Sequence, residues 1–382
     1  MTFVFISNYF NHHQKPLADA IFAKLGDGYH FIETEPMSEE RKNMGWGMNQ
    51  KPSYVLQSYT GAEQLQQCQQ LLLEADVVMW GSAPYNMIVP RLKAGKLTLG
   101  YSERLYKAGC PYHKLPWHFG LYTKKFRRYK NFYLLCASAY TAADFAKTFC
   151  FLNKTYKWGY FPDVKEYADI DALIESKKPA SILWAGRIMD WKHPEYAVEV
   201  AKRLHNDGID FTLNIIGNGQ MDAAIQEMVE KEGLSQYVKL LGSMKPEQVR
   251  EHMEQSEIYL FTSDRGEGWG AVLNESMNSA CAVVACSAIG AAPFLLQDGE
   301  NGRMYKSGDV DGLYRHVKDL LANTNERKRL SRNAYTTLTQ EWNPKNAANK
   351  LLHLCERLLS GEKRPFPYPT GVCSKAEVLK DE

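Results

Sequence analysis

Residues 258–280 read IYLFTSDRGEGWGAVLNESMNSA. An apolar run typical of a buried strand is followed by three glycines at alternating positions and then by a helix-like segment. This order is typical of α/β folds in which backbone N–H groups at a helix N-terminus meet an anion. Two acids, Glu267 and Glu275, lie about two helical turns apart. A glycine run alone is weak support for phosphate binding, so the rest of the chain must decide.

The same alternation of strand-like and helix-like segments runs through most of the chain. The first half contains the strand-like runs FVFIS, YHFIE, DVVMWGS, LTLGYS and NFYLLCAS. From Ser181 the alternation restarts with SILWAGR, FTLNIIG, YVKLLG, IYLFTS and CAVVACS. Residues 161–180 between the halves are rich in proline and charge, which indicates a hinge. The sequence therefore predicts two α/β domains, at residues 1–165 and 166–345.

Composition narrows the class of protein without naming it. With 382 residues, 45% hydrophobic and 24% charged, the chain has the composition of an ordinary folded protein. A net charge of +2 does not by itself indicate nucleic-acid binding. The N-terminal residues lack the basic and apolar regions of a signal peptide, and no apolar run approaches the ~18 to 20 residues of a membrane span. The eight cysteines show no zinc spacing, so we expect reduced thiols in a cytoplasm, with Cys281 and Cys286 in the core.

Cations and further glycines follow other predicted strands of the second half. Arg187 comes directly after a strand, and Lys192 precedes a helix that starts with proline. Gly217 and Gly219 follow the next strand. Because open α/β sheets bind ligands at the carboxyl ends of their strands, we expect these residues at one edge. A fixed pair of cations suits a diphosphate that gains charge as it leaves a sugar, and a surface loop with two solvated cations is the alternative.

The ordered series AGR…WK, IIGNG, LLG, EGWG…NES and DGENG gives residues 181–345 a family resemblance. This region resembles the C-terminal half of a family 4 retaining glycosyltransferase. The resemblance implies a GT-B fold, in which two Rossmann-like α/β domains face a central cleft. It implies that Arg187 and Lys192 bind the donor diphosphate, that Glu267 lies beside the transferred sugar and that Glu275 holds the nucleotide ribose. The implied backbone contacts to the donor come from Gly186, Gly217, Gly268, Trp269 and Gly270.

The resemblance also implies a reaction. A sugar moves with retention from a UDP- or GDP-linked donor to a saccharide acceptor, which we expect to be lipid-linked, in polysaccharide or glycoconjugate biosynthesis. The second domain would bind the donor, and the first domain, with residues 346–382 packed back on it, would bind the acceptor. In the front-face mechanism suggested for the family, the leaving phosphate takes the acceptor's proton. No cofactor and no metal are expected, and the pairs Asp169/Asp171 and Asp309/Asp311 are interpreted as helix caps or first-turn acids.

The first half resembles the family only in outline. The first strand ends in ISNYFNHHQKP instead of a glycine pair, so His12 and His13 either replace that loop or are exposed histidines. Glu103 and Arg104 follow LTLGYS and form either a structural ion pair or a site that orients the acceptor hydroxyl. His118 is a further acceptor-side candidate, with a packed structural histidine as its alternative.

Residues 112–135, YHKLPWHFGLYTKKFRRYKNFYLL, interleave cations with aromatic side chains. Such a segment suits the headgroup region of an anionic membrane. Nucleic acid is the competing partner, but no recognised nucleic-acid module accompanies the segment, and a solvated helix with a buried aromatic stripe is a third interpretation. The sequence predicts a cytoplasmic protein without a nucleic-acid partner, with attachment to the inner face of the cell membrane as an option.

Other functions remain open on the sequence alone. A sugar-nucleotide epimerase or phosphorylase of similar fold would act without a sugar acceptor, and a non-catalytic sensor would bind the donor without turnover. A dehydrogenase is disfavoured because neither first-strand turn reads GxGxxG with an acid at the expected distance.

Overall fold

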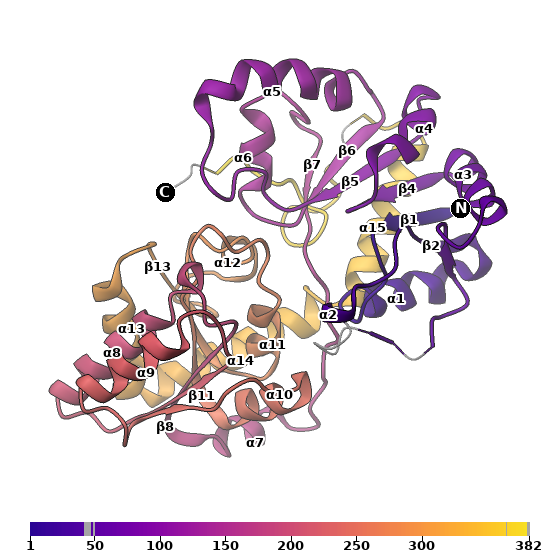
Figure 1. Cartoon of the computed structure of the whole chain (residues 1–382). Helices are drawn as coiled ribbons and strands as arrows, with labels where there is room; N and C mark the ends of the chain where they lie inside the picture. Colours follow the sequence, from indigo (N-terminus) through magenta and orange to yellow (C-terminus); the bar gives the residue numbers. More distant parts are fainter. Residues whose placement is uncertain (42–46, 49, 364, 380–382) are drawn as a thin grey trace. The chain divides into compact units, whose positions relative to one another are not determined.

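A computed structural model of the chain describes residues 1–41, 47–48, 50–363 and 365–379, and it divides into two compact units (Figure 1). The N-terminal unit consists of Met1–Asp163 and Trp342–Lys380, and the C-terminal unit of Val164–Glu341. The chain passes from the first unit to the second inside the proline-rich stretch 161–180. It returns at Trp342, just before the helix α15, Pro344–Leu359. Asn343 caps this helix by accepting a hydrogen bond from the Asn346 amide at 2.8 Å, and a proline occupies its first turn.

The N-terminal unit contains a parallel sheet of seven strands in the order β3-β2-β1-β4-β5-β6-β7. Its central strands are buried along their length, as expected when helices cover both faces of a parallel sheet. The strands are β1 Phe3–Ser7, β2 Tyr29–Glu33, β3 Val55–Gln57, β4 Val77–Trp80, β5 Thr98–Ser102, β6 Phe132–Cys136 and β7 Thr155–Lys157. The helices are α1 Lys15–Leu25, α2 Glu39–Arg41, α3 Ala62–Glu74, α4 Val89–Lys93, α5 Leu115–Tyr122 and α6 Thr141–Ala146, with α15 packed against α1.

The C-terminal segment lies along the edge of this same sheet. The Lys157 amide donates to the Ser374 carbonyl at 2.8 Å, and the Cys373 amide donates to the Lys157 carbonyl at 2.9 Å. Tyr156 and Lys375 form an antiparallel bridge. Residues after α15 therefore pair with β7 and satisfy backbone groups that an edge strand would otherwise expose.

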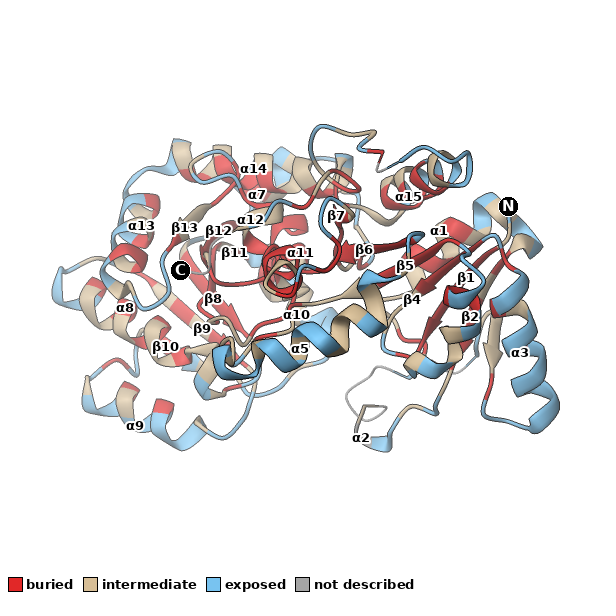
Figure 2. Cartoon of the chain, turned by 90° about the horizontal axis from the view of Figure 1, so that it is seen from above, coloured by how far each residue is buried: buried red, intermediate tan, exposed pale blue. Residues whose placement is uncertain are grey.

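The C-terminal unit contains a parallel sheet of six strands in the order β10-β9-β8-β11-β12-β13. The strands are β8 Lys178–Ala185, β9 Thr212–Ile216, β10 Val238–Leu240, β11 Ser256–Phe261, β12 Ala282–Cys286 and β13 Arg303–Tyr305. The helices are α7 Ile170–Glu175, α8 Pro194–Asn206, α9 Asp222–Lys231, α10 Pro246–Gln255, α11 Val272–Asn278, α12 Ala292–Leu295, α13 Val310–Ala322 and α14 Thr324–Gln340. In Figure 2 the strands of both units are largely buried, and the helices expose one face. The predicted class, two Rossmann-like α/β domains, is confirmed.

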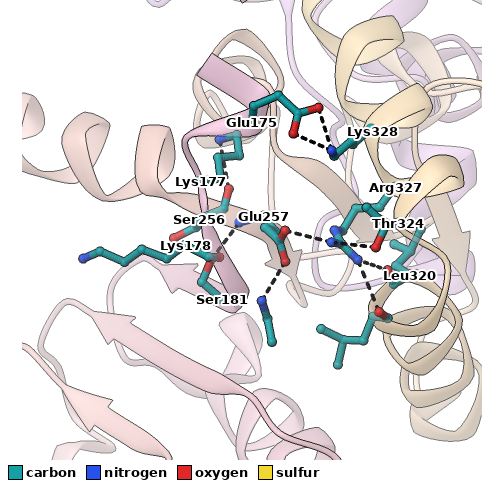
Figure 3. A network of polar contacts seen from close by, with 12 residues as sticks. Glu175, Lys177, Lys178, Ser181, Ser256, Glu257, Leu320, Thr324, Arg327 and Lys328 are labelled. Carbon is teal, nitrogen blue, oxygen red and sulfur yellow. Dashed lines mark hydrogen bonds and ion pairs between the residues drawn. The ribbon is translucent and has the colours of Figure 1, made fainter. Parts of the chain in front are cut away.

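A buried cation holds together the amino edge of the second sheet, opposite the edge where β8 and β11 end (Figure 3). The Lys177 ammonium donates to the carbonyls of Met253, Ser256 and Ser279 at 2.9 to 3.0 Å. Burial lowers the pKa of Lys177. The ammonium satisfies carbonyls at the ends of α10 and α11, so its role is structural.

No helix among the described residues is both long and apolar enough to cross a membrane. Cys281 and Cys286 are buried in the core, as expected, and all eight cysteines are free thiols.

Candidate functional site

Two loops of the C-terminal unit meet at the carboxyl edge of its sheet, where β8 and β11 end side by side. The first loop carries Lys192 and the second carries Glu267, and their charged groups form an ion pair. Both side chains are mostly buried, with 13% and 12% of their surface exposed. The Ser263 hydroxyl donates to the same Glu267 oxygen at 3.1 Å. A partly buried pair of this kind fixes the ammonium in position.

Backbone contacts hold the two loops in register. The Asp264 amide donates to the Trp191 carbonyl at 3.0 Å, and the Thr262 hydroxyl donates to the Lys192 carbonyl at 2.7 Å. His193 adds a weaker contact, with its Nε2 at 3.5 Å from an Asp264 carboxylate oxygen. A hydrogen bond to Glu195 is the main cause that raises the pKa of His193. The ion pair therefore rests on a rigid support.

Arg187 leaves β8 through Gly186 and is exposed. Its guanidinium carbon lies 5.8 Å from the ring centroid of Trp191, and the Lys192 ammonium lies 4.6 Å from the same centroid. The indole thus gathers both predicted diphosphate-binding cations, because a ring face attracts positive charge. Within the described residues Arg187 has no acidic partner, so its charge is available to a ligand.

The glycines of these loops have packing roles. A Cβ at Gly217, whose φ is +136°, would lie 1.8 Å from the Gly186 carbonyl oxygen, and one at Gly219 would lie 2.2 Å from the Ile188 carbonyl. The loops after β8 and β9 therefore touch backbone to backbone. Only glycine permits such an approach.

The glycine-rich turn also depends on close packing. Gly270 has φ +86°, and a Cβ there would lie 2.5 Å from the Phe261 ring. Trp269 is expected to contact the donor through its backbone; its side chain is completely buried, and its indole N–H donates to Asn274 at 2.8 Å. The Trp269 ring belongs to the core, so only the backbone of residues 268–270 remains for ligand contact.

Glu275 lies on α11, half-buried. Burial raises the pKa of its carboxyl, and Arg250 acts in the opposite direction. Within the described residues the carboxylate accepts no hydrogen bond from the protein. A desolvated carboxylate without donors is suited to accept hydrogen bonds from ligand hydroxyls.

A cavity of about 530 Å³ lies within the N-terminal unit, at the carboxyl ends of β1, β4 and β5. Glu103 lines it, and its carboxylate accepts from the Tyr160 hydroxyl at 2.7 Å and from the Lys107 ammonium at 2.5 Å. The cavity combines hydroxyl and amide groups with aromatic side chains. The aromatic part includes Trp80, Phe126, Phe132, Phe145 and Phe151.

Two of the other acceptor-side candidates, Arg104 and His13, line the cavity, and His12 does not. Arg104 lines the cavity and is ion-paired with the buried Asp144 at 3.5 Å. His13 also lines the cavity, and burial together with His12 lowers its pKa to about 3, so the ring is neutral. The His12 ring lies tilted against that of His13, with ring centroids 3.9 Å apart, but His12 is not a lining residue.

His118 does not line the cavity either. Its ring stacks between Tyr106 and Tyr122, with centroids 5.7 and 5.5 Å away, and its Nδ1 lies 3.0 Å from the Tyr106 hydroxyl. These contacts favour the packing alternative for this histidine.

The aspartate pairs act as expected at helix starts. Asp169 caps α7 and Asp309 caps α13, each accepting backbone N–H groups at 2.9 Å. Across the described ranges, no three His, Cys, Asp or Glu side chains gather as a metal site would require.

No sequence pattern singled out Ser263, Asp264, Trp191 or His193. Trp191 and His193 flank Lys192, whereas Ser263 and Asp264 lie three to four residues before Glu267, and the two loops that meet are about 75 residues apart. Their nearness to predicted residues was the only signal in the sequence.

Two parallel-sheet Rossmann-like units, with cations and a glycine-rich turn at the carboxyl edge of the second sheet, define the GT-B class. Residues 167–337 match the family model described as "Glycosyl transferases group 1", which supports that family for the C-terminal unit.

Known relatives match part of the chain. The UDP-N-acetylglucosamine–peptide N-acetylglucosaminyltransferase GtfA subunit of Streptococcus pneumoniae is 28% identical over 153 residues, which are 39% of this chain and 29% of that protein. The amylovoran biosynthesis glycosyltransferase AmsK of Erwinia amylovora is 27% identical over 141 residues, 36% of this chain and 34% of that protein. The matched stretches thus span about a third of each relative.

Solved structures share the fold of the whole chain. Anabaena HepE, solved in complex with UDP, has a TM-score of 0.67 at 15% identity and covers 93% of this chain and 100% of its own. The pneumococcal O-GlcNAc transferase GtfA, solved with UDP and GlcNAc, has a TM-score of 0.66 at 13% identity and covers 94% and 99%. At these identities the likeness establishes the GT-B fold.

Proposed function

We propose that the chain is a glycosyltransferase that moves a sugar, with retention at the anomeric carbon, from a nucleotide-diphosphate sugar to a saccharide acceptor. One observation carries the proposal: Arg187 and Lys192 share the Trp191 ring at the carboxyl edge of the sheet, with Glu267 paired to Lys192. The match to the group 1 family supports it, as does the UDP bound in structures of the same fold.

In this proposal the donor diphosphate displaces part of the Lys192–Glu267 pairing. Lys192 and Arg187 then stabilise the charge that grows on the departing phosphate oxygen as the bond to the sugar breaks. Glu267, released on one side, accepts hydrogen bonds from sugar hydroxyls, and Glu275 does so from the ribose. The leaving phosphate takes the proton of the attacking hydroxyl, so no protein base and no metal are required.

The acceptor side of the proposal rests on the cavity of the N-terminal unit. Its mixture of aromatic and hydrogen-bonding side chains suits a saccharide, whose apolar ring face packs on aromatic rings while its hydroxyls bind polar groups. Glu103 and His13 are the groups that would orient the attacking hydroxyl. We propose a lipid-linked acceptor of polysaccharide or glycoconjugate biosynthesis, reached from the inner face of the cell membrane through residues 112–135.

The test is nucleotide release from a panel of UDP-, GDP- and ADP-sugars, with and without a lipid-linked acceptor extract. The proposal expects release with one donor that depends on the acceptor and disappears in Arg187→Ala. Acceptor-independent remodelling of the donor would replace it with an epimerase or phosphorylase. Thermal stabilisation by one donor, without turnover in any acceptor extract, would replace it with a nucleotide-sugar sensor.

A further inference from the structure

The helix α5 and the loop that follows α6 form one exposed aromatic surface on the N-terminal unit. The Phe119 and Phe149 rings meet edge to face, with centroids 6.0 Å apart. Trp117 on the same helix is 64% exposed and Phe149 is 57% exposed, and α5 has no buried residue (Figure 2). We call Trp117, Phe119 and Phe149 the aromatic surface.

Cations border this surface. The Arg127 guanidinium carbon lies 5.8 Å from the Phe119 centroid, and Lys124 and Arg128 are exposed on the same helical stretch. Residues 104–161 contain eleven lysines and arginines and one acid, Asp144. That acid is buried and paired with Arg104 and Lys147. No exposed carboxylate in this stretch offsets the positive charge, so the surface is complementary to an anion-rich partner.

Phe149 occupies a backbone position that favours glycine. It follows the end of α6, where its amide donates to Ala146 and the Cys150 amide donates to Phe145, and its φ is +57°. A left-handed residue at a helix C-terminus is usually glycine, because a side chain there is strained. Most of the phenyl ring is exposed, and the ring contact recorded for it among the described residues is the edge contact with Phe119. Its benefit is therefore expected outside the isolated protein.

We propose that this surface docks on an anionic lipid bilayer. Trp117 and Phe149 enter the boundary between headgroups and acyl chains, while Lys124, Arg127 and Arg128 contact lipid phosphates. The inference rests on the proposed function and deepens it, because part of the aromatic wall of the acceptor cavity comes from the same two segments. Phe126 of the first segment contacts Phe145 and Phe151 of the second, with centroids 5.7 and 5.6 Å apart. A lipid-linked acceptor held in the cavity would then remain close to its membrane.

A nucleic acid is the other partner that cations and aromatic rings could serve. Its bases stack on flat rings, whereas an exposed aliphatic side chain offers them little. Leu152, three residues after Phe149, is 47% exposed. A hydrocarbon boundary accepts Trp, Phe and Leu alike, so the mixture favours lipid.

The test is co-sedimentation of the full chain with vesicles of phosphatidylcholine alone, or with about one third phosphatidylglycerol. We expect binding to the anionic vesicles that is lost at high salt. Phe149→Gly should weaken it at least ~10-fold, and Lys124→Gln with Arg128→Gln about 30-fold, since each cation near an anionic surface contributes about five-fold. Leu73→Ser, at an exposed apolar position on α3, is the matched control and should bind as the wild type does.

Phe149→Gly also separates a docking role from a structural one. Because glycine relieves the left-handed strain, the variant should keep or raise the melting temperature while it loses vesicle binding. Equal sedimentation with neutral and anionic vesicles, or unchanged binding by Phe149→Gly, would overturn the proposal. So would a single-stranded oligonucleotide that binds more tightly than the vesicles and depends on the same residues.

Donor-induced thermal stabilisation, measured in the same samples, tests the proposed function separately. Stabilisation by a nucleotide sugar without vesicle binding would defeat the docking surface alone. Vesicle binding without any response to nucleotide sugars would defeat the proposed function alone.

Discussion

The loops at the carboxyl edges of the two sheets are held in place by different kinds of contact. In the C-terminal unit the loops after β8, β9 and β11 pack backbone on backbone, and the Lys192–Glu267 pair lies on that support. In the N-terminal unit the loop after β1 contains no glycine, and polar and aromatic side chains surround a cavity of about 530 Å³. One edge is fixed by the main chain and the other is shaped by side chains. In our proposal the edge fixed by the main chain binds the nucleotide-sugar donor, and the edge shaped by side chains binds the acceptor.

The largest effect should come from removing the cation of the fixed edge. Lys192→Met keeps the aliphatic stem beside Trp191 but removes the ammonium that meets the leaving phosphate. We expect nucleotide release in the presence of acceptor to fall about 10² to 10³-fold. Steady-state kinetics with the best donor checks this, and Lys202→Met, whose partner is Glu232 on the surface, is the control. Activity within a factor of about two of wild type would remove Lys192 from the site.

The backbone contact of the fixed edge can be broken directly. Gly217→Ala would bring a Cβ to 1.8 Å from the Gly186 carbonyl oxygen, so the β8 and β9 loops must separate. We expect a loss of about 3 kcal/mol in the free energy of unfolding, from urea denaturation. Gly308→Ala is the matched control, because its φ is +80° with no atom within 4 Å, and it should cost about 1 kcal/mol. Equal costs would mean that backbone strain alone, and not the close approach, makes Gly217 necessary.

The same contrast explains what the sequence could predict. Long apolar runs such as FVFIS and CAVVACS mark the buried strands, so the two parallel sheets follow from pattern alone. β10 has three residues and was predicted, because it lies in the apolar run YVKLLG. The strands β3, β7 and β13 are equally short and were not predicted, because three residues alone show no period. Their existence depends on pairing with a longer neighbour in the sheet.

Some residues of the candidate site could also be predicted from the sequence, and others could not. Glycines required by close packing, such as Gly217 and Gly270, can be recognised in the sequence because they lie in turns that follow strands. The partners Ser263 and Asp264 cannot, since their roles arise from contact between distant loops. The burial of the Trp269 ring was not predicted, because a glycine-flanked aromatic has no pattern that distinguishes an exposed ring from a buried one.

A smaller effect should come from Glu275→Gln, which should weaken donor binding but stabilise the fold. Glu275→Gln removes the negative charge and replaces one of the two acceptor oxygens with an NH2 donor, so we expect donor affinity to fall about 10-fold by calorimetry. Because burial raises the folded pKa of this carboxyl, its ionisation opposes folding at neutral pH. The variant should therefore be more stable by about 1 kcal/mol at pH 7.

That gain should shrink as the pH falls through the raised folded pKa, and vanish below the ordinary value of 4.5, where the carboxyl is protonated in both states. Urea unfolding of Glu275→Gln and of the wild type, at pH 7 and below pH 4.5, checks the sign of the stability difference. A variant that is destabilised at pH 7 would indicate that the Glu275 carboxylate supports the fold.

The smallest effect should come from the side-chain edge. Glu103→Gln keeps an oxygen that can accept from the Tyr160 hydroxyl but removes the charge that holds Lys107. We expect the acceptor KM to rise a few-fold, with the donor dissociation constant unchanged, because this residue lies in the N-terminal cavity and outside the donor constellation. His118→Phe is the control: its ring lies between Tyr106 and Tyr122, away from the cavity, and should leave the acceptor KM unchanged. A change in donor affinity without any change in the acceptor KM would reverse the roles assigned to the two edges. If kcat of Glu103→Gln no longer fell at acidic pH as kcat of the wild type does, Glu103 would be a proton acceptor in the reaction. That result would contradict transfer of the proton to the leaving phosphate.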